Sequence, residues 1–259
     1  MAEPVENASA SEIAAFFEAI DKGDLAAVKK TVEENPGAVN WEKDEIGPLL
    51  AAITSSDMDH RKEIAFFLID HGTNLNARQP IPDGEPMIPF SLHWSGEDIA
   101  LKLVEKGADL TWKSPPGGEE KIKEICAVFE NTFILGTGIT FLMTAASSNA
   151  LRLAAALLDK GADINEKDSR GQTALMYAAD NGHTAMTDLL ISRGASLAGC
   201  GEDGQDLLTI AQNGLNQQAL PSITEAFRQI KEEIVPAMHA GTENPISVSG
   251  PLKLKRNTP

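Results

Sequence analysis

Two nearly identical strings decide the fold: "LMTAA" at residues 142–146 and "LMYAA" at residues 175–179, which start 33 residues apart. Other landmarks keep the same step, since Gly138, Gly171 and Gly204 are also 33 residues apart. Downstream, "LLDKGADIN" (157–165) has a counterpart in "LLISRGASL" (189–197). A fixed period of this length indicates an architecture of stacked repeats.

The stretch "DSRGQTALMYAADNGHTAMTDLLISRGASL" (168–197) resembles an ankyrin repeat. The neighbouring unit ends in "GADIN", another signature of that family, whereas the family's Thr-Pro-Leu-His string reads "TALM" (173–176) here. The resemblance implies an all-α fold, an ankyrin-repeat solenoid of helix pairs joined by short extended or β-turn fingers. The features that carry it are Asp168, Gly171, Thr173, Leu175, Ala178, Ala179, Gly182, His183, Leu189, Leu190, Gly194 and Ala195.

The repeat pattern extends towards the N-terminus through turns at Gly37, Gly72 and Gly107, which are 35 residues apart. We therefore expect about six helix-pair units in a single array over residues 1–235, followed by a C-terminal tail over residues 236–259. The outer two units are expected to act as caps with polar outer sides.

One irregular step interrupts the array, because Gly161 follows Gly107 by 54 residues, about 21 more than the period. The insertion, residues 114–138, is expected to be a helical or hairpin finger, which either covers a hydrophobic seam or takes part in binding. Ser11, Asp24 and Thr184 fit the N-cap positions of helices.

Bulk composition narrows the possible functions. The net charge is −16, and residues 1–60 hold 13 acidic and 4 basic side chains. This charge argues against nucleic-acid binding, which needs a cationic surface. It suits either a basic protein partner or simple solubility. No basic, apolar leader and no run of about 20 apolar residues is present, so we expect a cytoplasmic protein with no membrane partner.

The sequence offers no candidate set of catalytic residues. Cys126 and Cys200 stand far apart, and the five histidines are scattered over different units. The string "GTGIT" (136–140) lacks the rest of a phosphate-binding loop. We therefore expect a protein that is not an enzyme and needs no cofactor or metal. His183 is expected in a core or capping role, and His93 either contacts a partner or reflects local repacking.

The resemblance implies a binding surface made of finger tips and the exposed side of the short helices. Tyr177, the only tyrosine, is expected to be an exposed anchor; the alternative is that it covers the adjacent helix. The expected partner-binding residues are Thr144, Ser147, Ser148, Tyr177, Asp180 and Asn181 on the short helices, and Arg78, Glu166, Lys167, Asp168 and Arg170 at the tips.

The leading hypothesis is a non-catalytic module, a monomer or part of a hetero-complex, that binds a protein through its concave face and finger tips. A sharper alternative is an acidic immunity or inhibitor protein that neutralises a basic toxin or effector. A second alternative is a structural assembly subunit, which would form concentration-dependent oligomers in light scattering.

Overall fold

The computed structural model describes residues 8–55, 60–78, 86–114, 137–197, 207–213, 218–219, 221–225 and 228. The chain divides into two compact units, residues 1–112 (unit 1) and residues 113–259 (unit 2). The described residues contain no strand, and their only bridges are the isolated pairs Lys43–Ile46 and Arg78–Pro86. The predicted all-α repeat fold is confirmed. A single array over residues 1–235 stays a prediction.

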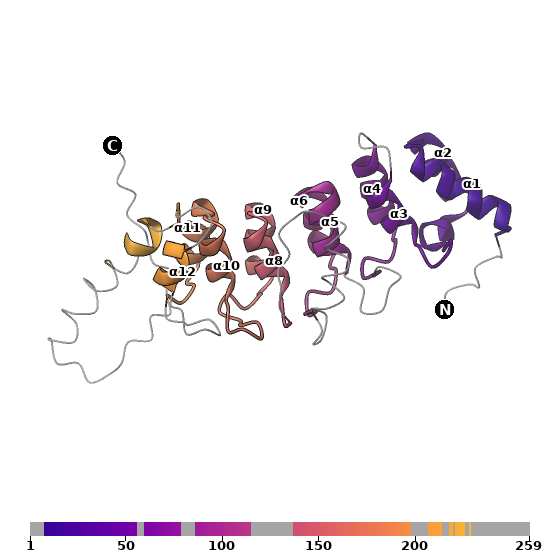
Figure 1. Ribbon diagram of the computed structural model, residues 1–259. Helices are drawn as coiled ribbons and strands as arrows, with labels where there is room; N and C mark the ends of the chain where they lie inside the picture. Colours follow the sequence, from indigo (N-terminus) through magenta and orange to yellow (C-terminus); the bar gives the residue numbers. More distant parts are fainter. Residues whose placement is uncertain are drawn as a thin grey trace. The chain divides into compact units, whose positions relative to one another are not determined.

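Unit 1 is built from helix pairs stacked in two layers (Figure 1). Helices α1, α3 and α5 pack side by side in one layer, and α2, α4 and α6 form the other. Their bounds are α1 Ala10–Asp21, α2 Leu25–Glu34, η1 Pro36–Asn40, α3 Pro48–Thr54, α4 Arg61–Asp70, α5 Met87–Ser95 and α6 Glu97–Glu105.

Unit 2 has the same two layers of helices, and the helices of one layer are shorter than those of the other. Helix α10 packs against both α8 and α12, while α9 and α11 pack together behind them. Small alanine side chains let α8 and α10 pack closely: Ala145, Ala146, Ala178 and Ala179 are all fully buried. The bounds are α8 Phe141–Ser147, α9 Leu151–Asp159, α10 Ala174–Asp180, α11 Thr184–Ser192 and α12 Leu207–Asn213.

The longer helices α4, α6, α9 and α11 end in the same turn. Gly161 and Gly194 have φ angles of 90° and 92°, a left-handed conformation that a side chain disfavours. The following amides reach back into the helix, from Ala162 to the Leu157 carbonyl and from Ala195 to the Leu190 carbonyl, both at 3.0 Å. Gly37 differs, because Pro36 starts a 3-10 helix there in place of this turn.

Side-chain hydrogen bonds join consecutive repeats at nearly the repeat period. The Asn40 Oδ1 accepts from the Asn74 amide at 2.8 Å, 34 residues on. In unit 2, the Asn165 Oδ1 accepts from the Ser196 amide at 2.7 Å, 31 residues on. Because these bonds tie each finger to the next one, they fix the register in which neighbouring repeats stack.

Replacing Asn165 with alanine should therefore destabilise unit 2 by about 1 kcal/mol, the usual net value of one hydrogen bond. Urea unfolding followed by circular dichroism measures the change. The matched control is Asn181→Ala, whose side chain bonds only within its own repeat, to the Tyr177 carbonyl. A faster amide exchange at Ser196 in the Asn165 variant alone would identify the lost contact; unchanged exchange would contradict it.

The helix starts agree with the sequence analysis at one position out of three. Asp24 is the N-cap of α2, as predicted, and its carboxylate accepts from the Ala27 amide at 2.9 Å. The prediction for Ser11 is wrong: Ser9 caps α1, in a capping box with Glu12. The prediction for Thr184 is also wrong, because Thr184 is already helical and its hydroxyl donates to the Gln218 carbonyl at 2.9 Å.

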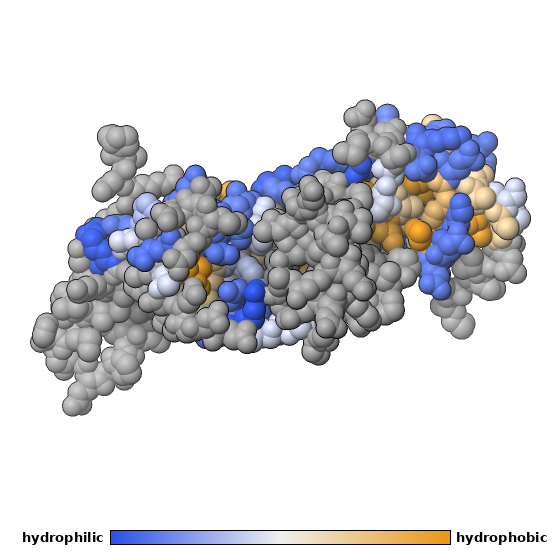
Figure 2. Space-filling view, viewed as in Figure 1, coloured by the Kyte–Doolittle hydropathy of each residue, from blue (hydrophilic) through white to orange (hydrophobic). Residues whose placement is uncertain are grey.

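The polar outer side expected for the first repeat is only partly present. Helix α2 exposes charged side chains, among them Lys30 and Glu33. Helix α1, however, also exposes Ala10, Ala14 and Ala15. Figure 2 accordingly shows an apolar area on unit 1 in the region where Figure 1 places α1.

The insertion lies largely outside the described residues, so the finger predicted for residues 114–138 stays a prediction. Its two ends are described and lie together. The Ser114 hydroxyl accepts from the Ile139 amide at 2.8 Å, and the Ser114 amide donates to the Ile139 carbonyl at 3.0 Å. The Gly138 amide donates to the Ser114 carbonyl at 2.8 Å, so the chain returns to the point from which it departed.

Candidate protein-binding site

The best-defined finger of unit 2 spans residues 166–172 and is organised by one buried carboxylate. The side chain of Asp168 is fully buried. Its Oδ1 accepts from the backbone amides of Arg170 at 2.9 Å and Gln172 at 2.7 Å. Its Oδ2 accepts from the Tyr177 hydroxyl at 2.8 Å. The tip therefore has one conformation, fixed by the helix that follows it.

Tyr177 supports the finger from inside, so the prediction of an exposed anchor is wrong. Only 6% of Tyr177 is exposed. Its hydroxyl donates to Asp168 and accepts from Arg170 Nη2 at 2.8 Å. The physical reason is that the finger folds back, so that the Asp168 carboxylate and the Arg170 guanidinium both contact the Tyr177 hydroxyl. Asp168 and Tyr177 are positioning residues, and Arg170 is half-buried between them and solvent.

Burial and the hydrogen bond to Asp168 raise the pKa of Tyr177. Since the folded state favours the protonated phenol, the associated stability is complete below the unfolded pKa of about 10 and falls as the pH rises above it. We expect stability to fall by up to about 1.4 kcal/mol per pH unit above pH 10, and we expect Tyr177→Phe to remove this component.

The measurement is clean because the chain has only one tyrosine. Ultraviolet difference spectra should show tyrosinate forming near pH 10 in urea but only at higher pH in the folded protein. Urea titrations of wild type and Tyr177→Phe at several alkaline pH values give the linked change in stability. Tyrosinate formation at the same pH in both states would contradict the buried hydrogen bond.

The other residues predicted on the short helices lie in or directly after α8 and α10, which pack together. Ser148 and Asp180 are exposed, whereas Thr144, Ser147 and Asn181 are half-buried. A His183 ring nitrogen lies 2.9 Å from the Ser147 carbonyl, so the predicted core or capping role of this histidine is confirmed. The side chain of His93 lies outside the described residues.

Two charged residues stand at the start of the finger. Lys167 is exposed, while Glu166 is half-buried and forms an ion pair with Lys113. Arg78 lies in unit 1, at the end of a different finger. The exposed candidate contacts of unit 2 are therefore Lys167, Ser148 and Asp180.

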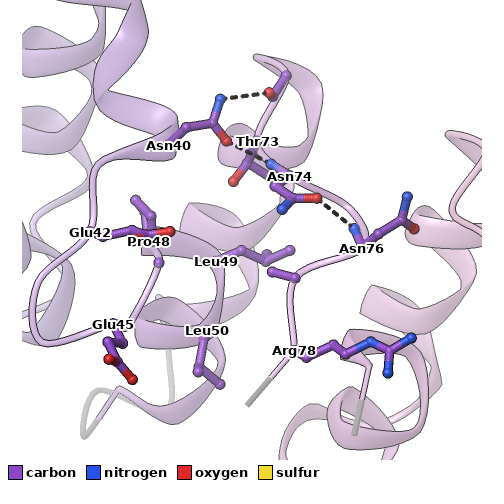
Figure 3. Close-up of a pocket in the computed structure, with 13 residues that line it drawn as sticks. Asn40, Glu42, Glu45, Pro48, Leu49, Leu50, Thr73, Asn74, Asn76 and Arg78 are labelled. Carbon is purple, nitrogen blue, oxygen red and sulfur yellow. Dashed lines mark hydrogen bonds between the residues drawn. The ribbon is translucent and has the colours of Figure 1, made fainter. Parts of the chain in front are cut away.

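Sequence reasoning missed a pocket of about 500 Å³ in unit 1, which we call the unit 1 pocket. It lies between the loops of two successive repeats (Figure 3). No repeated string marks it, since residues of two loops form it jointly. Its lining residues are Asn40, Glu42, Glu45, Gly47, Pro48, Leu49, Leu50, Gly72, Thr73, Asn74, Asn76, Ala77 and Arg78.

In the described part of the chain, no helix combines the length and apolar character that crossing a membrane requires. Within the same residues, no three His, Cys, Asp or Glu side chains come together in a way that would hold a metal ion. The candidate contact surfaces within the described residues are the finger, the exposed ends of α8 and α10, and the unit 1 pocket.

The stacked helix pairs, period and fingers define a helical-repeat protein. The family model described as "Ankyrin repeats (3 copies)" matches residues 119–219. With the curated relatives below, this match shows that this part of the chain consists of ankyrin repeats. Ankyrin repeats generally mediate protein–protein interaction, and the family is typically non-catalytic.

Curated relatives share the repeats but are much longer proteins. The ankyrin repeat and KH domain-containing protein mask of Drosophila melanogaster is 48% identical over 63 residues, which are 24% of this chain and 2% of that protein. Rabankyrin-5 of Mus musculus is 29% identical over 130 residues, 48% of this chain and 10% of that protein. The chain thus spans a small part of these relatives.

A solved structure matches over a greater extent. It is a complex of a predatory endopeptidase from Bdellovibrio bacteriovorus with an immunity protein. One chain of this complex aligns with a TM-score of 0.58 and 26% identity, over 84% of the present chain and 98% of the solved one.

Proposed function

We propose that this chain is a non-catalytic protein-recognition module, and that its contact surface in unit 2 is the finger 166–172 together with the exposed ends of α8 and α10. The observation that carries the proposal is the buried Asp168 carboxylate, which holds the finger in one conformation through three hydrogen bonds. A surface that is ordered before binding loses little conformational entropy when a partner docks. The binding role of Lys167, Arg170, Ser148 and Asp180 is part of the proposal.

A charge-swap variant tests this surface. Lys167→Glu combined with Asp180→Lys should weaken partner binding about tenfold or more, because both side chains are exposed on the proposed surface. Affinity capture with each immobilised protein, quantified by mass spectrometry and then by calorimetry with the captured partner, gives the ratio. Helix content should not change.

The matched control is Lys160→Glu combined with Asp188→Lys. It makes the same charge changes on the layer of longer helices, at the end of α9 and within α11. Binding should stay within about twofold of wild type, the range of surface electrostatic changes. If both variants bind the partner as tightly as wild type, the contact surface lies elsewhere. If both variants bind weakly, binding depends on the overall distribution of charge and not on this surface.

A more specific candidate is an immunity or inhibitor protein that neutralises a basic effector. Two observations favour it: the likeness to a chain of an endopeptidase–immunity complex, and the net charge of −16. The capture should then return a basic hydrolase whose activity falls in proportion to added protein, with affinity that weakens as salt rises. Retrieval of only acidic or neutral partners, or binding insensitive to salt, would count against this candidate.

A further inference from the structure

The unit 1 pocket has the volume of a ligand site. Its volume of about 500 Å³ lies within the usual range of ligand sites. The buried side chains of Pro48, Leu49 and Leu50 contribute its apolar part. Figure 3 shows Glu42 and Glu45 on one side and Arg78 on the other, with the leucines between them.

The two glutamates have unused binding capacity. Both are exposed, and neither forms a hydrogen bond or ion pair within the described residues. Carboxylates on one side of a pocket favour a cation, and Arg78 opposite favours a carbonyl or carboxylate oxygen. The lining thus matches a segment that presents a positive side chain at one end and an acceptor at the other.

Both walls of the pocket are held in place before any ligand arrives. The backbones of Lys43 and Ile46 exchange hydrogen bonds of 3.0 and 2.9 Å, which close the turn that carries Glu45. On the opposite loop, Asn74 Oδ1 accepts from the Asn76 amide at 3.0 Å, while the Asn74 amide donates to Asn40. The backbones of the two loops therefore keep their separation.

Most of the net charge of the chain lies in the unit that contains this pocket. Unit 1 has 21 acidic and 9 basic residues, a net charge of −12, whereas unit 2 has 17 and 13, a net charge of −4. Such a field attracts basic segments over a distance of about a Debye length and raises their rate of association.

We propose that the unit 1 pocket is a docking site for an extended segment of a protein partner, which places an arginine side chain against Glu42 and Glu45. The inference rests on the proposed function, since it names the class of segment that the module recognises. It concerns a surface in a different unit from the finger 166–172.

A short peptide tests the site directly. The probe is a capped Gly-Ser-Arg-Ser-Gly peptide, and its control replaces arginine with citrulline, which has nearly the same shape without the charge. The side-chain amide signals of Asn40, Asn74 and Asn76 in nuclear magnetic resonance spectra report binding at the pocket. We expect the arginine peptide to bind about fivefold more tightly, the ratio for one surface ion pair of about 1 kcal/mol.

Variants separate local recognition from net charge. Glu42→Gln with Glu45→Gln should weaken arginine-peptide binding about fivefold and leave citrulline-peptide binding unchanged. The control, Glu33→Gln with Glu63→Gln, removes the same charge from exposed positions on α2 and α4 and should change binding less than about twofold. Equal loss in the two double variants would overturn the inference.

Gly47 allows a steric test that does not depend on charge. Its φ of −82° suits any residue, and an added Cβ would meet no atom within 4 Å. Gly47→Gln should therefore block both peptides while the unfolding temperature stays that of wild type. Peptide binding that survives this change, or amide shifts absent from the pocket at about 5 mM peptide, would overturn the inference.

The captured partner distinguishes failure of this inference from failure of the proposed function. If the Glu42/Glu45 and Gly47 variants bind the partner normally while the Lys167/Asp180 variant does not, the inference fails and the proposed function stands. If spermidine competes with the peptide at equal concentration, a free polyamine is the ligand and the inference is overturned. Weakened partner binding in the pocket variants, with control variants unaffected, supports it.

Discussion

Replacing Asp168 with alanine is expected to lower the free energy of unfolding by about 3 kcal/mol. The side chain of Asp168 is fully buried and accepts hydrogen bonds from two backbone amides and the Tyr177 hydroxyl. Its loss leaves these three donors without their acceptor and removes the carboxylate that lies 3.6 Å from Arg170 Nε. Urea unfolding followed by circular dichroism gives the loss of stability.

Asp163 provides a matched control for this variant. Its carboxylate also accepts from the backbone amide two residues on, at 2.9 Å, but Asp163 is exposed. Because water can replace an exposed acceptor, Asp163→Ala should cost no more than about 1 kcal/mol. Equal losses for the two variants would show that burial of the Asp168 carboxylate adds nothing to the stability of the finger.

Replacing Leu153 with alanine should cost about 3 kcal/mol, within the range for large-to-small changes in a packed core. Leu153 in α9 is fully buried, so truncation removes apolar contact and leaves a cavity between closely stacked helices. The loss is measured by urea unfolding and by faster amide exchange in α8 and α9.

Leu151→Ala is the comparison, since this substitution removes the same atoms from the same helix. Leu151 starts α9 and is only half-buried. Its replacement with alanine should cost about half as much or less, because water already reaches part of the side chain. A Leu153 variant as stable as the Leu151 variant would mean that the repeats collapse around the cavity and recover the lost packing.

The repeat architecture was predictable because it depends on spacing along the chain. The step of 33 residues locates helix pairs and turns in the two best-matched repeats, and Gly161 and Gly194 adopt the left-handed turns that their positions require. The error at the first helix was avoidable. Ser9 stands three residues before Glu12, the spacing of a capping box, whereas Ser11 has no such partner.

The burial of Tyr177 was harder to predict, because it depends on a contact nine residues back in the chain. Only the folded finger brings Asp168 to the phenol. A buried aspartate paired with the only tyrosine leaves no periodic signal in one sequence. The unit 1 pocket is similar: Glu45 and Arg78 come from loops of different repeats, and neither loop alone has a recognisable motif.

The junction at Ser114 and Ile139 offers a site for protein engineering. Hydrogen bonds between these two residues bring the ends of the intervening segment together. Doubling the length of such a closed loop costs only about 0.6 kcal/mol of entropy. Foreign sequence, such as a peptide tag or a small fluorescent domain, should be accepted here while both neighbouring repeats keep their fold.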